Sequence, residues 1–153
     1  MEVMRFAAEK TLGRLARWLR LLGFDTIFES DVNSRVFFER LEPERTLLTR
    51  TRYVRKKYGA RRLIFIGSND PFEQLKQVIG ELELKPEDIR PFSRCLKCNI
   101  AIVEIDKDSV FGQVPDYIWE THQSFRRCNQ CGRIYWAGTH IKRSMERIKE
   151  LFA

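Results

Sequence analysis

Four cysteines occur as two Cys-x-x-Cys pairs, Cys95 with Cys98 and Cys128 with Cys131. A Cys-x-x-Cys turn presents two thiolates to one ion, and two such turns complete the tetrahedral coordination of zinc. This closed set leaves no coordination position for a substrate, so the zinc is expected to be structural. Unrelated buried thiols or a redox pair are the alternative interpretation. We predict one structural zinc ion bound by these four residues.

A second chemical feature is a concentration of positive charge. The chain has 28 Lys and Arg against 21 Asp and Glu, a net charge of +7. Between residues 45 and 62 there is no acidic residue, and the basic ones are Arg45, Arg50, Arg52, Arg55, Lys56, Lys57, Arg61 and Arg62. A solvated face usually mixes both signs of charge, so this run favours an anionic partner, of which nucleic-acid phosphates are the most common. A general solubility feature is the alternative.

The elements that must position these groups begin with an expected strand at residues 3–7. Apolar residues then recur at helical spacing from Leu12 to Leu22, and Gly23 is suited to the end of that helix. The same helix carries a basic stripe beside Trp18. Its members are Arg14, Arg17 and Arg20. An exposed helix face without a partner would explain the stripe equally.

Further strands are predicted at residues 26–28, 46–49 and 63–67, with a helix over 36–41. The uninterrupted apolar run at 63–67 suits the centre of a parallel sheet. A helix is expected from Pro71, capped by Asn69 or Asp70. This alternation of strands and helices predicts an α/β fold with a parallel sheet flanked by helices.

Composition predicts two parts, an α/β domain over residues 1–90 and a zinc module with a C-terminal helix over residues 91–153. In the zinc module we expect strands at 101–105 and 133–136, a short helix at 115–120 and a helix at 139–151. Basic and aromatic residues alternate near the second cysteine pair. Tyr135 and Trp136 are therefore candidates both for the core of the module and for stacking on RNA bases.

Apolar residues make up 43% of the chain, enough for a core, yet no apolar run is long enough to cross a bilayer. The first six residues lack the pattern of a secretory signal. We therefore expect a soluble, cytoplasmic protein with no membrane partner. In a reducing compartment, paired cysteines bind metal more often than they form disulfides.

Several longer segments form a recognisable series. They are Glu9-x-x-Leu-Gly-Arg-Leu-Ala-Arg-Trp-Leu-Arg-Leu-Leu-Gly-Phe-Asp25, Leu47-Leu-Thr-Arg50, Asp70-Pro-x-x-Gln-Leu75 and the two cysteine pairs with Arg133-Ile-Tyr-Trp-x-Gly-Thr-His140. Together they resemble the Mut-seven C-terminal RNase-domain family over nearly the whole chain. The resemblance implies a PIN-like nuclease fold followed by a zinc ribbon, with RNA as the substrate class. It also implies carboxylates at the C-terminal ends of parallel strands, which would hold Mg²⁺ or Mn²⁺ if the chain is catalytically active.

The candidate catalytic residues that the resemblance implies are Glu9, Asp31 and Asp70. Glu9 occupies a position where the family pattern has Asp, and two further expected acids are replaced by Ser34 and Thr51. A divalent ion at a phosphodiester needs several converging carboxylates, so this set is depleted. Capping of the helix at Pro71 would by itself explain Asp70. Three acids could still reach the vacated positions: Glu39, Glu42 and Glu44.

The loss of acidic residues and the gain of basic ones favour an RNA-binding protein over an active nuclease. Ribosomal RNA is one candidate partner. An active Mg²⁺- or Mn²⁺-dependent ribonuclease and a protein-interaction adaptor are the open alternatives. The predicted RNA-binding residues are Arg14, Arg17, Arg50, Arg52, Arg55, Lys56, Lys57, Arg61 and Arg62.

Overall fold

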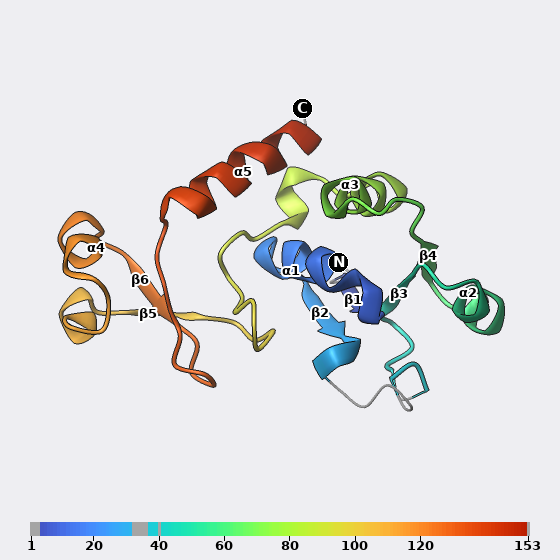
Figure 1. Cartoon of the computed structure of the whole chain (residues 1–153), viewed down its shortest axis with the longest axis horizontal. Coiled ribbons are helices and arrows are strands. Elements are labelled where there is room, and N and C mark those ends of the chain that lie inside the picture. Colours follow the sequence, from blue (N-terminus) through green and yellow to red (C-terminus); the bar gives the residue numbers. More distant parts are fainter. Residues whose placement is uncertain (1–3, 32–36, 40, 153) are drawn as a thin grey trace.

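The first sheet of the protein is parallel and has four strands (Figure 1). A computed structural model describes residues 4–31, 37–39 and 41–152. The strand order is β2-β1-β3-β4, and all three strand pairs are parallel. The strands are β1 (Arg5–Ala8), β2 (Asp25–Phe28), β3 (Thr46–Thr49) and β4 (Leu63–Phe65). The predicted α/β class and the positions of these four strands are confirmed.

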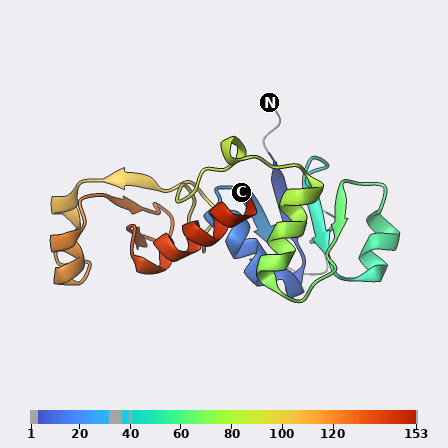
Figure 2. The ribbon, with the colours of Figure 1, turned by 90° about the horizontal axis from the view of Figure 1, so that it is seen from above.

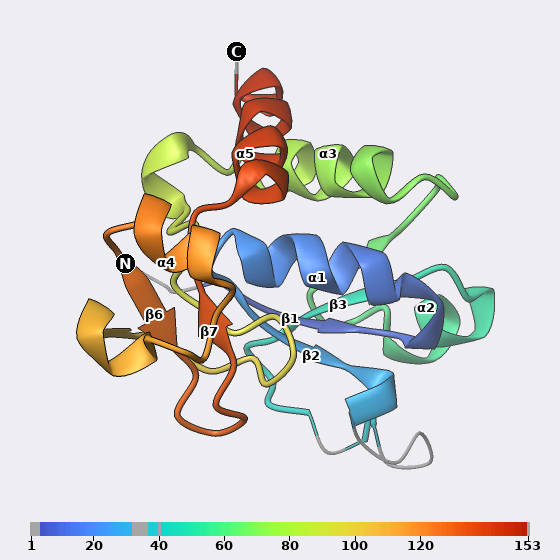
Figure 3. The same ribbon diagram turned by 60° about the vertical axis from the view of Figure 1, so that its left-hand side comes forward.

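Helices α1 (Gly13–Leu21) and α3 (Pro71–Glu81) pack on one face of this sheet (Figure 3). Side chains alternate between the faces of a strand, so Phe6 and Ala8 join the core beneath these helices, whereas Ala7 packs on the other face with Leu47. The third helix of this part is α2 (Arg52–Tyr58). The C-terminal ends of the four strands consequently lie along one edge of the sheet.

Three details of this part differ from the sequence-based expectation. The strand at Leu63–Phe65 lies at an edge of the sheet, and the completely buried strand β3 has the central place beside β1. Residues 37–39 of the helix expected over 36–41 form a turn, while residues 36 and 40 lie outside the described chain. The basic run was not expected to be helical, yet α2 forms there because Val54 and Tyr58, one helical turn apart, pack inward.

The second part of the chain contains an antiparallel sheet of three strands in the order β5-β6-β7. These strands are β5 (Val103–Ile105), β6 (Phe125–Arg127) and β7 (Ile134–Tyr135), and the helices are α4 (Asp116–Thr121) and α5 (Thr139–Leu151). A separate apolar cluster around Val110, Ile118 and Phe125 supports the sheet. The short β6 was not expected from the sequence. Short 3-10 turns complete the elements, at Lys10–Leu12, Glu29–Asp31, Pro86–Asp88 and Lys107–Val110.

Helix α5 joins the two parts. Figure 2 shows the second sheet and α4 extending away from the first sheet, while α5 runs back toward α1 and α3. Ile148 of α5 is 1% exposed and belongs to the same apolar core as α1 and α3, with Met145 and Leu151 packed beside it. The predicted domain boundary near residue 90 stays a prediction. Apolar contacts of α5 with α1 and α3 cross this boundary, so the two parts share one core.

A buried guanidinium makes the other principal connection between the parts. Arg20 on α1 is 4% exposed. It donates to the carbonyl oxygen of Thr26 at 2.9 Å, to that of Leu96 at 2.9 Å and to the carboxylate of Asp31. Leu96 lies between Cys95 and Cys98, so the first cysteine turn is held directly against α1 and β2.

Among the described helices, none has the length and apolar character needed to cross a bilayer.

Candidate functional site

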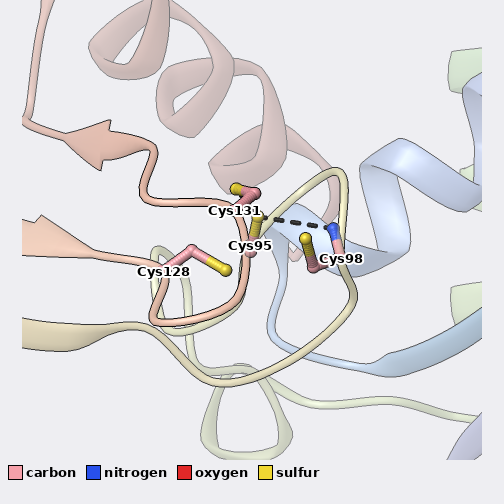
Figure 4. Close-up of side chains that lie close together, drawn as sticks. All are labelled: Cys95, Cys98, Cys128 and Cys131. Carbon is pink, nitrogen blue, oxygen red and sulfur yellow. Dashed lines mark hydrogen bonds between the residues drawn. The ribbon is translucent and has the colours of Figure 1, made fainter.

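The four cysteines converge on one point although the two pairs are far apart in the sequence (Figure 4). Their Sγ atoms all lie within 4.8 Å of one another, and those of Cys95 and Cys131 are 3.8 Å apart. Zn–S bonds of about 2.3 Å in a tetrahedron place two sulfurs about 3.8 Å apart. The cluster therefore fits one four-coordinate metal ion such as zinc.

The backbone of each cysteine turn is shaped to present its thiols. In the first turn the N–H of Cys98 donates to the Sγ of Cys95 at 3.4 Å, and Asn99 adopts a left-handed conformation with φ 61°. In the second turn Gly132 has φ 76°, a conformation that glycine adopts without steric cost. These turns close the coordination set, which indicates a structural rather than a catalytic metal.

The hydroxyl of Tyr135 contacts the first cysteine turn. Its hydroxyl lies 3.1 Å from the Sγ of Cys95 and accepts a hydrogen bond of 3.1 Å from the N–H of Leu96. The neighbouring Trp136 is half-buried and packs against the apolar cluster of the second sheet. Of the two interpretations of these aromatic residues, the contacts favour the structural one.

The thiols of the cluster differ in acidity. Burial acts to raise the pKa of Cys95, but hydrogen bonds from the Tyr135 hydroxyl and from the backbone N–H groups of Cys98 and Lys97 lower it to about 6. Desolvation and the neighbouring thiols raise the pKa of Cys98 to about 12. The hydrogen bonds to Cys95 thus favour its thiolate, the form that binds a metal ion, while the crowding of the thiols favours the protonated form of Cys98.

Glu9 immediately follows β1 at the edge where the parallel strands end, and its side chain is buried, with 4% exposure of the residue. One carboxylate oxygen accepts hydrogen bonds from the hydroxyl of Thr11 at 3.0 Å and the backbone N–H of Arg50 at 2.5 Å. The other accepts from the hydroxyls of Thr49 at 2.9 Å and Thr51 at 2.8 Å. Thr51, at the expected acidic position, thus donates a hydrogen bond to Glu9 instead of adding a second charge.

The other two candidate acids have different partners. Asp31 forms an ion pair with the buried guanidinium of Arg20. Asp70 caps α3, because its carboxylate accepts the backbone N–H of Glu73 at 2.9 Å. The residues that the structure describes contain no trio of acids gathered as the cysteines are. Among the described residues, Glu9, Asp31 and Asp70 thus each have their own protein partners and do not form one shared carboxylate cluster.

Two of the three acids considered for the vacated positions, Glu42 and Glu44, have their partner away from the Glu9 edge. Glu42 and Glu44 both pair with Arg5, which begins β1 at the opposite end of the strand. Glu39 is exposed and lies in the turn at residues 37–39. Ser34, the other expected acidic position, lies outside the described residues.

The basic run divides into buried and exposed residues. Arg45 is 4% exposed and pairs with Asp25 at 3.0 Å, so it does not belong to a surface for an anionic partner. Burial acts to raise the pKa of Asp25, but hydrogen bonds from Arg45 and Asn99 hold it below its usual value. Arg61 is half-buried and donates to the backbone oxygen of Glu42. The sequence analysis placed both arginines in one basic run because charge alone does not distinguish a buried ion pair from an exposed face.

The remaining predicted RNA-binding residues are exposed. Five of them lie on α2 or directly before it, and two lie on α1; Arg62 follows α2. They are Arg50, Arg52, Arg55, Lys56, Lys57, Arg62, Arg14 and Arg17. The side chain of Arg50 bonds to that of Asn69, and the Arg55 guanidinium lies 5.0 Å from the centre of the Phe65 ring. Both residues thus have their positive charge fixed near the C-terminal edge of the sheet.

A parallel-sheet α/β part with a four-cysteine module defines the class of this protein. The chain belongs to the Mut7-C RNAse domain family, whose model matches residues 4–148. The family resemblance inferred from the sequence is thereby confirmed. Comparison with curated proteins finds no match, and comparison with solved structures also finds none.

We expect the purified chain to carry about one metal ion, because the four thiolates form a single closed site. Cys128→Ser should abolish stoichiometric binding and loosen residues 95–152, since the binding energy of a structural metal is folding energy. Elemental analysis and hydrogen exchange measure both effects. Ser124→Ala, an exposed change in the same part of the chain, is the control. Full metal content and unchanged exchange in Cys128→Ser would refute the closed site.

Proposed function

We propose that this chain is an RNA-binding member of its family that contains one structural zinc and has lost efficient metal-dependent cleavage. The observation that carries the proposal is the hydrogen bonding of Glu9. Four donors from Thr11, Thr49, Arg50 and Thr51 occupy both oxygens of its carboxylate. A carboxylate offers about four lone-pair directions, so these donors use the positions through which it would bind a cation.

The chemistry of phosphodiester cleavage supports the same proposal. Mg²⁺ gives up its water reluctantly and is held in such enzymes by one or two free carboxylates together with substrate phosphates. Here Asp31 is neutralised by Arg20 and Asp70 caps a helix. Positive residues on α2 and Arg50 adjoin this edge of the sheet, and they attract phosphate without any need for a cation.

Zinc is the proposed metal of the cysteine cluster. A site of four thiolates with tetrahedral spacing favours zinc among the common divalent ions. The metal would act at a distance from phosphate chemistry by fixing the first cysteine turn, which in turn holds Arg20.

Family membership favours a second candidate function, a Mg²⁺- or Mn²⁺-dependent ribonuclease. This candidate requires that Glu9 exchange its hydrogen-bond donors for a metal ion when RNA binds. Cleavage and binding measurements separate the two functions, because the RNA-binding protein retains affinity in EDTA and the ribonuclease loses activity there.

RNA binding should depend steeply on salt and on the exposed face of α2. Replacing Arg55, Lys56 and Lys57 together by Ala should lower the slope of log affinity against log salt by roughly 2, because each single-strand phosphate contact contributes about 0.7. Fluorescence anisotropy with a labelled single-stranded RNA measures the slope. The matched control replaces Lys76, Arg143 and Lys149, exposed basic residues on α3 and α5. Equal slopes for the two triple variants would show that α2 is only a solvated face.

Cleavage should be slow or absent in the natural chain and should rise when the missing acids are returned. Thr51→Asp places negative charge beside Glu9 and removes one of its donors, and Ser34→Asp restores the second acid that the family pattern implies, so a cation is attracted. Mn²⁺ should serve better than Mg²⁺ because it binds more tightly to a given set of ligands. A time course on labelled RNA with Mg²⁺, Mn²⁺ or EDTA measures this.

The control for the restoration is Thr51→Asn with Ser34→Asn, which changes the same side chains without adding charge. Efficient, EDTA-sensitive cleavage by the natural chain, abolished in Glu9→Gln, would instead establish the ribonuclease.

A further inference from the structure

A cleft of about 570 Å³ lies between α1 and α5, and the N-terminus of α3 and the first cysteine turn complete its walls. Arg14 and Arg17 line it from α1, and Arg147 lines it from α5. The cleft is therefore built by both parts of the chain. Its volume is in the range of sites that enclose small molecules, which is too small for a nucleic-acid duplex and sufficient for nucleotides of a single strand.

The charge of this cleft is predominantly positive. Its lining contains three arginines, His140 and a single acid, Asp70, whose carboxylate already accepts the cap hydrogen bond of α3. Within the described chain, neither Arg14 nor Arg17 has an acidic partner at ion-pair distance. Their guanidinium groups are consequently available to bind phosphate, which arginine recognises through paired N–H donors.

Aromatic rings lie beside these charges. The rings of Trp18 and Phe72 are 5.8 Å apart in an edge-to-face arrangement. The guanidinium of Arg147 lies 4.1 Å from the centre of the Phe72 ring and 5.8 Å from that of Trp18. Planar aromatic and guanidinium groups are the surfaces on which unpaired bases stack in single-stranded RNA recognition. An acidic peptide would use the arginines but would gain nothing specific from the rings.

We propose that the cleft between α1 and α5 binds a short single-stranded segment of RNA, with Arg14 and Arg17 on phosphates and bases against the Trp18, Phe72 and Arg147 group. The inference rests on the proposed RNA-binding function and names the surface that accepts unpaired nucleotides. Pro71 at the start of α3 lines the cleft, and Asn69 just before it contacts Arg50, so the cleft continues from the C-terminal edge of the sheet. Bound RNA would thus contact both parts of the chain.

The test compares two variants of the full, zinc-loaded chain that lose the same charge. Arg14→Gln with Arg17→Gln removes the phosphate contacts, and Arg143→Gln with Lys149→Gln removes exposed basic residues that do not line the cleft. Affinity for a labelled oligouridine should fall on the order of tenfold in the cleft variant, and its salt slope should fall by about 1.4. The control variant should change much less in both quantities.

A second measurement locates the bases directly. Oligouridine containing 4-thiouridine is photo-crosslinked to the natural chain, and mass spectrometry should find adducts on peptides containing Trp18, Phe72 or His140. Poly-glutamate is the competitor that tests for an acidic protein segment, and it should displace the RNA less well than unlabelled oligouridine of equal charge.

The outcomes separate this inference from the proposed function. If the natural chain binds oligouridine, yet the two double variants behave alike and adducts occur only near α2, the cleft assignment is wrong and RNA binding remains. Competition by poly-glutamate equal to that by RNA, without adducts in the cleft, would also overturn the assignment. If the natural chain binds no RNA, both proposals fall together.

Discussion

A carboxylate that is buried away from water needs hydrogen-bond donors. The donors around Glu9 determine whether this edge of the sheet can bind a cation. The residue follows β1, and its donors come from the first 3-10 turn, from the last residue of β3 and from the two residues after β3. A charged acceptor in four hydrogen bonds stabilises the junction of these segments without a metal. The end of β1, where the family resemblance implies a carboxylate site, therefore carries a hydrogen-bond network in which both oxygens of Glu9 have partners.

Arg20 performs the corresponding task between the two parts of the chain. Its guanidinium satisfies carbonyl oxygens of β2 and of the first cysteine turn, and it compensates the charge of Asp31. Asn99 adds a contact nearby, because its side chain accepts the N–H of Thr26 and donates to Asp25. These contacts and the packing of α5 hold the cysteine module against α1, which is the arrangement that creates the basic cleft.

Most helices and strands could be predicted because each depends on residues close together in the chain, and the metal site could be predicted because the same Cys-x-x-Cys pair occurs twice. The cysteine spacing identified the metal cluster, and Asp70 before Pro71 marked the start of α3. Helix α2 was missed because only Val54 and Tyr58 anchor an otherwise charged segment. The partners of Glu9 depend on contacts across about 40 residues, and neither charge nor periodicity encodes such contacts.

The central claim is that polypeptide donors, and not a cation, satisfy Glu9. The most direct measurement is the carbon NMR signal of the Glu9 side-chain carboxylate in the zinc-loaded chain during titration with paramagnetic Mn²⁺. Our account predicts that this signal keeps its linewidth at equimolar Mn²⁺, because the four hydrogen bonds leave no position for the ion. Selective broadening of the Glu9 signal at equimolar Mn²⁺ would contradict the account.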